Sequence, residues 1–299
     1  MSLCPVVPRQ GATVRMLLLV VTSSMIGCRK TLPCEYLASM NPQPPPLISV
    51  LLPVYNNMAY LREAISSMLT QTLDDLECVI FDDGSTEPVW QVVETFADPR
   101  IVHVRNPTNM GLAAALNCCL DVARGRYFAR MDSDDISMPT RLEEELALFT
   151  AGVGLVSCWG YTVTADGQRI PPAEDPYLFT RIRVSNEAIR QNITQGNLLL
   201  GAASIFPRDV FERIGYFDEE LALAEDYNYW LRILQHYEVA VVPKELYQRR
   251  RHANNMSHWQ RFSRQIDYAE LSRQRARQFP TVTHRPISRP EAPNIINEA

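Results

Sequence analysis

The sequence predicts an α/β fold with a largely parallel sheet, and two features of the chain support this prediction. Ile48 to Val54 reads ISVLLPV, a continuous apolar and β-branched run that is typical of a strand buried on both faces. Tyr60 to Leu69 then carries apolar residues at helical spacing. The alternation of such strands and helices continues as far as Met131, which indicates β-α-β units.

The elements of this first part follow one another closely and form a Rossmann-like half from Leu47 to Met131. A second buried strand, ECVIFDD, ends in a turn at Asp83 and Gly84. In chain order the pattern predicts a strand over 48–54, a helix over 60–69, a strand from 77 to that turn, a helix over 90–96, a strand over 100–104, an alanine-rich helix over 111–123 and a strand over 126–131.

Beyond Met131 the alternation is weaker, and a proline-rich stretch around Pro171 to Pro176 interrupts it. In chain order we expect strands over 154–157 and 161–165, a strand over 197–206, helices over 208–214 and 225–236, and a short strand over 239–242. These elements complete the domain without repeating the first half.

Both ends of the chain differ in composition from the predicted domain. Pro42-Gln43-Pro44-Pro45-Pro46 is a stiff linker that fits neither sheet nor helix, and further prolines follow Phe279. We therefore expect a disordered leader and linker over 1–46, one domain over 47–260, a basic C-terminal helix over 261–279 and a disordered tail over 280–299.

The leader contains an apolar run, Met16 to Gly27, that is preceded by Arg9 and Arg15. This run is too short to cross a bilayer, which takes about 20 residues. It is similar to the apolar core of a secretion signal, and MIGC, which ends at Cys28, is a poor lipoprotein-type cleavage box. Two hypotheses follow, an exported lipoprotein or an unstructured leader, and we favour the second.

Composition excludes few classes of protein. The 299 residues are 46% apolar, as in an ordinary globular protein, and the net charge of -5 argues against nucleic-acid binding. Basic residues gather over 249–251 and 261–277, which indicates a solvated helix face or, alternatively, contact with anionic lipid or a polyanionic acceptor. The seven cysteines include no C-x-x-C pair, which fits a reducing compartment, and Cys78 is expected in the core.

Polar groups are concentrated at the carboxyl ends of the predicted strands, where an open parallel sheet binds its ligands. The first strand ends at Pro53-Val54-Tyr55-Asn56, the second at Asp82-Asp83-Gly84-Ser85, and the fourth at Asp132-Ser133-Asp134-Asp135. Taken alone, DDGS is typical of a tight turn with a helix cap, and Asn109-Met110-Gly111 of the start of a helix.

The three carboxylates from Asp132 to Asp135 repel one another unless a positive group neutralises them. One interpretation is an acidic helix N-terminus before Met138-Pro139. The other, which we favour, is a site for Mn²⁺ or Mg²⁺ together with a diphosphate, because these ions take carboxylate and phosphate oxygens as ligands.

The order PVYN, DDGS, NMG, RMDSDD and AED resembles the family 2 glycosyltransferases of the GT-A fold, from about Leu47 to Ser257. The resemblance implies a Rossmann-like nucleotide-binding half merged with an acceptor-binding half around one mixed, mostly parallel sheet. It also implies an enzyme that takes a sugar from a nucleotide-diphospho-sugar, with a UDP-sugar favoured, and attaches it to a saccharide or a lipid-linked saccharide acceptor.

The same resemblance implies a role for each matching residue. Asp226 is the expected catalytic base, Glu225 lies on the acceptor side, and Asp134 with His252 belongs to the metal site. The expected nucleotide-sugar-binding residues are Pro53, Tyr55, Asn56, Asp82, Asp83, Asn109, Gly111 and Asp132, with Asp83 accepting a hydrogen bond from a uracil-type ring. Without the resemblance, Glu225 and Asp226 are typical of an ordinary acidic first helical turn.

One absence narrows the class of enzyme that the resemblance implies. The chain lacks the Q-x-x-R-W motif of the processive synthases, since Gln248 is followed by Arg249-Arg250-Arg251-His252, so we expect a non-processive, inverting enzyme of surface polysaccharide or lipopolysaccharide synthesis. Its donor supply implies a cytoplasmic location, with peripheral membrane contact left open. The alternatives are a nucleotidyltransferase, disfavoured because Val54 to Met58 holds no glycine or lysine, and a non-catalytic nucleotide-sugar binder.

Overall fold

The structure is a computed structural model that describes residues 19–20, 44–175, 186–194, 196–221, 223–255, 262–278 and 294–295. Most of the expected leader and tail lies outside these residues. Leu19–Val20 and Asn294–Ile295 form strands at one edge of the sheet, although no regular structure was expected at either place.

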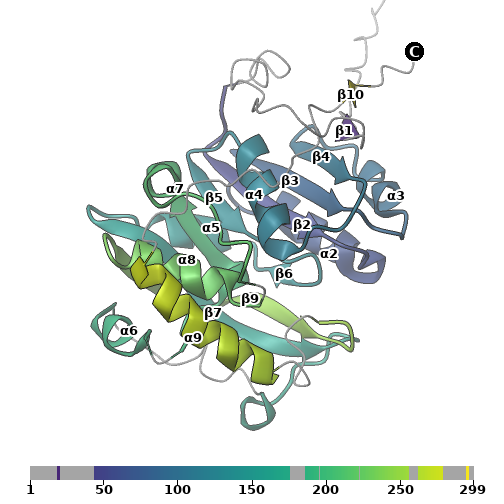
Figure 1. Cartoon of the computed structure of the whole chain (residues 1–299). Coiled ribbons are helices and arrows are strands. Elements are labelled where there is room, and N and C mark those ends of the chain that lie inside the picture. The colour runs from purple at the N-terminus through teal and green to yellow at the C-terminus, as the bar shows by residue number, and fades with distance from the viewer. Residues whose placement is uncertain are drawn as a thin grey trace, which may run out of the picture.

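The described elements follow the predicted alternation through the first half of the chain and diverge from it in the second (Figure 1). The strands are β1 (Leu19–Val20), β2 (Ile48–Val54), β3 (Leu76–Asp83), β4 (Ile101–Asn106), β5 (Tyr127–Arg130), β6 (Ile136–Ser137), β7 (Val153–Thr164), β8 (Ser204–Pro207), β9 (Glu238–Arg251) and β10 (Asn294–Ile295). The helices are α2 (Met58–Leu69), α3 (Val89–Glu94), α4 (Leu112–Val122), α5 (Arg141–Leu146), α6 (Asn186–Asn192), α7 (Arg208–Ile214), α8 (Glu225–Ile233) and α9 (Phe262–Gln278), with 3-10 turns η1 (Pro172–Glu174) and η3 (Gly201–Ala203).

One mixed sheet runs through the molecule in the order β10-β1-β4-β3-β2-β5-β8-β7-β9-β6. Strands β4, β3, β2 and β5 are parallel, as the Rossmann-like half requires. Strand β8 joins the two halves, because it pairs antiparallel with β5 on one side and with β7 on the other. The mixed, mostly parallel sheet predicted from the sequence is therefore confirmed.

Strand β7 is one continuous strand, where the sequence indicated two short ones. The register against β9 shifts at Cys158, Trp159 and Gly160, so the strand passes through this irregularity and continues. Gly160 permits the close approach, because a Cβ at that position would lie 2.8 Å from the carbonyl oxygen of Tyr247.

Strand β9 is also much longer than the predicted strand over 239–242. Pro243 and Lys244, which interrupt the apolar pattern, fall between the paired residues Val242 and Glu245 and take no place in the ladder with β7. Conversely, of the predicted strand over 197–206 only Ser204 to Phe206 is extended, and these residues begin β8. The basic residues 249–251 close β9 and do not lie on a helix.

The sheet is covered on both faces, which gives three layers (Figure 1). Apolar residues of α2 and α3 share a core with one face of β2 and β3, and those of α4 share a core with the other face. In the second half of the sheet, α5 lies against β7 and β9, α7 against β8 and α8 against β7. The helix α9 lies along α8. The amide of Asn228 on α8 donates to the carbonyl of Ser272 on α9. Cys78 is fully buried, as expected.

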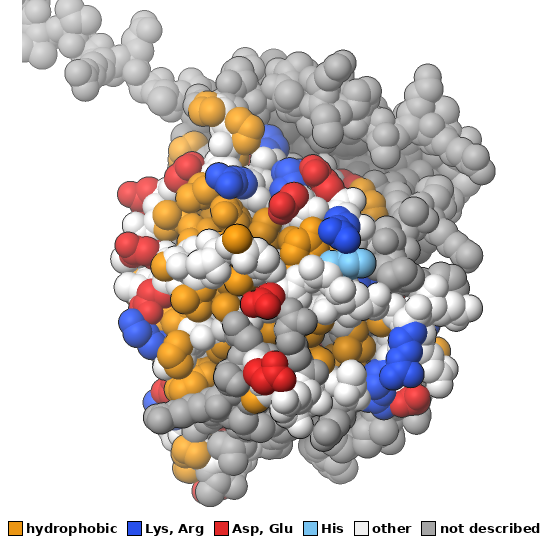
Figure 2. Space-filling view, turned by 90° about the vertical axis from the view of Figure 1, so that its left-hand side faces the viewer, with side chains coloured by type: hydrophobic (Ala, Val, Ile, Leu, Met, Phe, Trp, Pro, Cys, Tyr) orange, Lys and Arg blue, Asp and Glu red, His pale blue; other side chains and the backbone are white. Residues whose placement is uncertain are grey.

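No helix in the described part of the chain is long and apolar enough to span a membrane. On the face of the described residues drawn in Figure 2, acidic and basic side chains are interspersed among apolar ones, with no continuous surface of one sign.

Candidate active site

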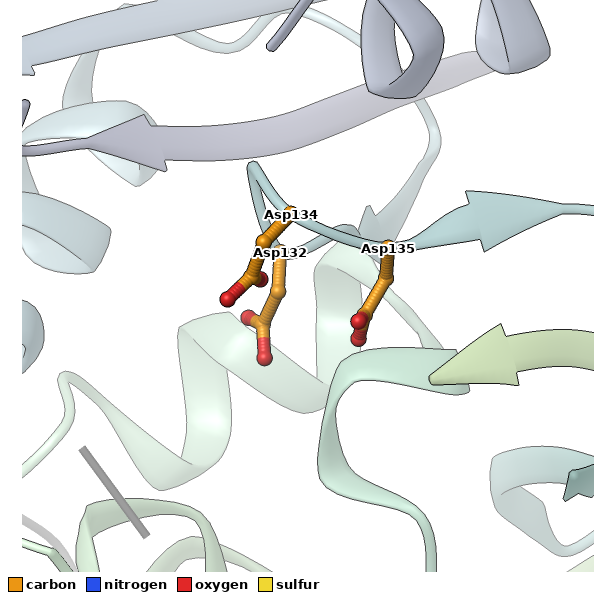
Figure 3. Close-up of side chains that lie close together, drawn as sticks. All are labelled: Asp132, Asp134 and Asp135. Atoms are coloured by element: carbon orange, nitrogen blue, oxygen red, sulfur yellow. The ribbon is translucent and has the colours of Figure 1, made fainter. Parts of the chain in front are cut away.

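The carboxylates of Asp132, Asp134 and Asp135 converge on the loop that follows β5. Figure 3 shows the three side chains extending from this loop in the same direction. Their ligand atoms all lie within 4.8 Å of one another. Oxygen donors this close together match the preference of Mn²⁺ and Mg²⁺, so this chain's residues fit the divalent ion that the sequence predicted.

The end of β9 supports this loop. Oδ2 of Asp134 accepts hydrogen bonds from Nε2 of His252 at 2.8 Å and from the amide of Asn255 at 3.0 Å. The backbone N–H of Asn254 donates to Nδ1 of His252, so the proton of a neutral ring is placed on Nε2, facing Asp134. The structure thus brings together the two predicted metal-site residues, with His252 contacting the carboxylate itself.

Asp135 is the most deeply buried of the three aspartates, at 3% exposure. Its Oδ1 accepts a hydrogen bond from the backbone N–H of Arg250 at 2.7 Å. Burial, followed by repulsion from the neighbouring aspartates Asp134 and Asp132, raises the pKa of Asp135 well above its usual range. A bound cation would offset that repulsion, and no separate role was predicted for Asp135.

A second group of predicted residues surrounds the loops after β2 and β3. Both carboxylate oxygens of Asp83 accept the backbone N–H of Met110 at 3.0 Å, and Oδ2 also accepts that of Gly111. Asp83 therefore fixes the loop before α4. Its predicted contact with a uracil ring stays a prediction, since the carboxylate is almost fully buried.

Asn56 organises the neighbouring loop. It has a left-handed backbone with φ 59°, and its side-chain oxygen accepts hydrogen bonds from the backbone of Thr86 and Glu87. The carboxylate of Asp82 accepts the backbone N–H of Ser85 at 2.8 Å and lies 3.5 Å from the guanidinium of Arg105. These residues shape the rim on which a nucleotide is expected.

The remaining predicted nucleotide-binding residues differ in exposure. Tyr55 is 49% exposed and Asn109 is exposed, so both are available to a ligand. Pro53 lies buried within β2, and Gly111 precedes α4 with φ 92°. The amide of Asn57 donates to Ser133 at 3.0 Å, which ties this group to the carboxylate loop.

Asp226 and Glu225 begin helix α8. Oδ1 of Asp226 accepts the backbone N–H of Tyr227, and Oδ2 accepts the amide of Asn197 at 3.2 Å. Burial raises the pKa of Asp226, whereas the positive charge of Arg130 counteracts part of this effect. Burial and the adjacent Asp226 raise the pKa of Glu225 to about 7.

Arg130, the last residue of β5, joins the two acidic groups. Its guanidinium is buried and lies 3.4 Å from Oδ1 of Asp132. It also interacts electrostatically with Asp226 and Glu225. The guanidinium therefore influences both the carboxylate at Asp132 and the expected base. No role was predicted for Arg130 from the sequence, although this residue directly precedes the acidic motif.

Known proteins of similar sequence are glycosyltransferases. The sequence matches the glycosyl transferase family 2 model over residues 49–215. An uncharacterized glycosyltransferase of Rickettsia prowazekii is 28% identical over 64% of this chain, and the match covers 59% of that protein. The E. coli glucosyltransferase WfaP, which acts on a diphosphoundecaprenol-linked sugar, is 35% identical over 33% of this chain and 40% of its own length.

Solved structures share the fold. The mannosyltransferase PcManGT from Pyrobaculum calidifontis, in complex with GDP-Man and Mn²⁺, matches 83% of this chain and 68% of its own, with a TM-score of 0.60 and 22% identity. S. aureus TarS in complex with UDP matches 75% of this chain and 64% of its own, with a TM-score of 0.56 and 22% identity. The sheet is thus that of the GT-A glycosyltransferases. Since the family match spans more than half of the sequence, the chain belongs to glycosyltransferase family 2.

Proposed function

We propose that this chain is a non-processive, inverting glycosyltransferase that moves a sugar from a nucleotide diphosphate to an acceptor hydroxyl. The observation that carries this proposal is the buried Arg130, which lies 3.4 Å from Asp132 of the carboxylate loop and interacts electrostatically with Asp226. A donor held by that loop presents its sugar toward Asp226. The chain spans 59% of the Rickettsia relative's length, so the activity is inferred from these residues.

The donor side of the site is built by Asp132, Asp134 and Asp135 together with the loops that Asn56 and Asp83 hold. TarS binds UDP and UDP-GlcNAc, and PcManGT binds GDP-Man with Mn²⁺. These complexes support a nucleotide-sugar donor here, and we favour a UDP-sugar. Mn²⁺ or Mg²⁺, when bound by the three aspartates, supplies positive charge against the departing diphosphate.

On the acceptor side, Asp226 takes the proton of the attacking hydroxyl as its oxygen bonds to the anomeric carbon. The bond from that carbon to the diphosphate breaks, and the electron pair leaves with the nucleoside diphosphate. Attack from the face opposite the leaving group inverts the anomeric configuration, and no protein nucleophile is required. Asp226 is suited to this role, because Arg130 favours its ionised form in a buried setting.

The acceptor is inferred to be a saccharide or a lipid-linked saccharide of surface polysaccharide synthesis. The similarity to WfaP, whose acceptor is a diphosphoundecaprenol-linked sugar, supports this class of acceptor. We infer a cytoplasmic site of action, since nucleotide sugars are made there, with peripheral contact to the membrane that carries such an acceptor.

The test is release of nucleoside diphosphate by the full chain from UDP-glucose, UDP-GlcNAc and GDP-mannose, with Mn²⁺ and with chelator. We expect turnover of one donor with metal only. Asp226→Asn should lower turnover by roughly 100-fold or more while still binding the donor, and Asp134→Ala should lower donor binding itself. Asp166→Asn, on an exposed turn, is the matched control and should match the wild type.

Two outcomes would overturn the proposal. No donor binding in the presence of Mn²⁺ would remove the nucleotide-sugar assignment. Full turnover by Asp226→Asn would show that Asp226 is not the catalytic base. Release of pyrophosphate from a nucleoside triphosphate and a sugar phosphate would instead identify a nucleotidyltransferase.

A further inference from the structure

The Asp226 carboxylate is oriented by a segment that no motif singled out, Asn197 to Ala203. Oδ1 of Asp226 is held by its own helix, through the N–H of Tyr227 at 2.6 Å. Oδ2 depends on this separate segment, because it accepts the side-chain amide of Asn197 at 3.2 Å. The two contacts come from different parts of the chain, so together they fix the plane of the carboxylate.

The amide of Asn197 has one orientation that satisfies its neighbours. Its side-chain oxygen accepts the backbone N–H of Leu199 at 3.1 Å, which leaves Nδ2 to face Asp226. Asn197 is therefore a fixed hydrogen-bond donor to the carboxylate. An aspartate of the same size in its place would present a second negative charge to Asp226 instead.

Gly201 adds a steric limit on the same oxygen. A Cβ at Gly201 would lie 2.1 Å from Oδ2 of Asp226 and 3.2 Å from Nη1 of Arg130. Real side chains essentially never approach so closely, so a methyl group there would displace the carboxylate. Gly196, five residues before Gly201, has no such limit, because a Cβ at Gly196 would meet nothing within 4 Å.

The turn that carries Gly201 is held in place by buried side chains. The hydroxyl of Ser157 on β7 donates to the carbonyls of Leu200 and Ala203. The guanidinium of Arg141 donates to the carbonyl of Ala202. Because both donors belong to the sheet and to α5, the segment cannot retreat from Asp226 without breaking these contacts.

We propose that Asn197 and Gly201 are positioning residues that aim the Asp226 carboxylate at the acceptor hydroxyl, the first by a hydrogen bond and the second by leaving room. This inference rests on the proposed role of Asp226 as base. A general base contributes about 10²- to 10⁴-fold to the rate, and only when it lies within hydrogen-bond reach of the proton that it takes. A carboxylate that is turned away from the acceptor hydroxyl loses part of this rate enhancement, while donor binding is unchanged.

The experiment compares Asn197→Asp, Asn197→Ala and Gly201→Ala with the control Gly196→Ala in the full chain. The readouts are kcat and KM for release of UDP with Mn²⁺, or of GDP if GDP-mannose is the active donor, and the affinity for that nucleoside diphosphate by calorimetry. We expect kcat to fall by roughly 10-fold or more in the three variants. Their affinity for the nucleoside diphosphate should stay within about twofold of the wild type, and Gly196→Ala should match the wild type throughout.

A double-mutant cycle with Asp226→Asn separates positioning from a general loss of structure. If both residues act through Asp226, adding Asn197→Ala or Gly201→Ala to Asp226→Asn lowers the residual rate no further. A further loss, or a loss of affinity for the nucleoside diphosphate, would overturn the inference. If Gly201→Ala fails to fold, Asn197→Asp, which keeps the side-chain size, decides. Wild-type kcat in that variant would also overturn it.

Failure of this inference is distinguishable from failure of the proposed function. An active Asp226→Asn variant would remove the base and therefore both proposals. An inactive Asp226→Asn variant beside fully active Asn197 and Gly201 variants would remove only the positioning role.

Discussion

Arg130 shows how one buried cation can serve two acidic groups. Its guanidinium lies 3.4 Å from Asp132 on the loop after β5, interacts electrostatically with Asp226 on α8 and is almost completely buried. The sequence predicted the carboxylate site because three aspartates within four residues repel one another unless a positive group neutralises them. It could not identify Arg130, because an arginine at a strand end is ordinarily solvated, and only the fold reveals what surrounds it.

The pH dependence of the rate should reflect this arrangement. Burial raises the pKa of Asp226, and the base acts only when ionised, so activity is lost as the pH falls through that raised pKa. We expect the acid limb of kcat/KM above about pH 4, the ordinary value for aspartate. Arg130→Met removes the opposing charge and should move the limb to higher pH. A limb that stays in place or moves down would contradict this assignment.

His252 should affect metal affinity more than catalysis once metal is saturating. Its Nε2–H orients the Asp134 carboxylate, and loss of such a contact typically weakens metal binding by roughly 10- to 100-fold. We expect His252→Ala to need correspondingly more Mn²⁺ in a titration of Mn²⁺-dependent UDP binding. His236→Ala, whose ring contacts Arg213, is the control. An unchanged Mn²⁺ midpoint in His252→Ala would show that Asp134 needs no such support.

The connection after β3 depends on the close approach of Gly84 to Thr108. Gly84 has φ +73°, and a Cβ there would lie 2.5 Å from the backbone carbon of Thr108. Gly84→Ala should lower the free energy of unfolding by roughly 2 kcal/mol or more, from backbone strain and the clash together. Gly167→Ala has a similar φ but open space, so about 1 kcal/mol is expected. Equal losses in urea unfolding would refute the role of the contact.

Helix α5 contains a buried acid whose titration should destabilise the protein at high pH. Burial raises the pKa of Glu145 from 4.5 to about 8, with Arg141 at 3.9 Å offsetting part of the effect. The folded chain keeps a proton that the unfolded chain releases. Between these two values, therefore, the contribution of Glu145 to the free energy of unfolding falls by about 1.4 kcal/mol per pH unit as the pH rises.

Glu145→Gln removes this titration. The stability of this variant relative to the wild type should increase steadily from about pH 5 to pH 8, the window set by the two pKa values. Urea unfolding at a series of pH values measures the difference. A difference that does not depend on pH would mean that Arg141 keeps Glu145 ionised.

The elements that the sequence predicted well are those whose signals are local. Strand β2 is a continuous apolar run, and α4 is a run of alanine and leucine, so both were placed within about two residues. The lengths of β7 and β9 were not predicted, because each of these strands is extended by pairing with the other across the sheet. The bulge near Trp159 and the unpaired Pro243 are tolerated only in that pairing, and no window of sequence contains both strands.

In the candidate site, too, the residues that were predicted are those with a local sequence signal. The site at Asp132 to Asp135 was predicted from the charges of its residues, and His252 from the family resemblance. Asn197 and Gly201 were missed as positioning residues, because their relation to Asp226 arises only when η3 folds against α8.

For the whole molecule, the continuous sheet predicts a single cooperative unfolding transition. Strand β8 pairs with a strand of each half, and each apolar core contains residues from both. Neither half can be exposed without opening the sheet at β8. We expect circular dichroism and tryptophan fluorescence to give coincident urea transitions. Separate transitions would show that the Rossmann-like half folds on its own.

The place of β8 in the sheet also has a consequence for the chain as it leaves the ribosome. Strand β5 ends at Arg130, yet its second neighbour begins only at Ser204, an interval on the order of ten seconds at about 5 to 20 residues per second. During that time the unpaired edge of β5 is exposed to incorrect strand pairing, which binding of a chaperone would prevent. Asp226 and His252 are synthesised later still. A nascent chain therefore lacks both the proposed base and the residue that contacts Asp134 until almost all of the domain has been translated.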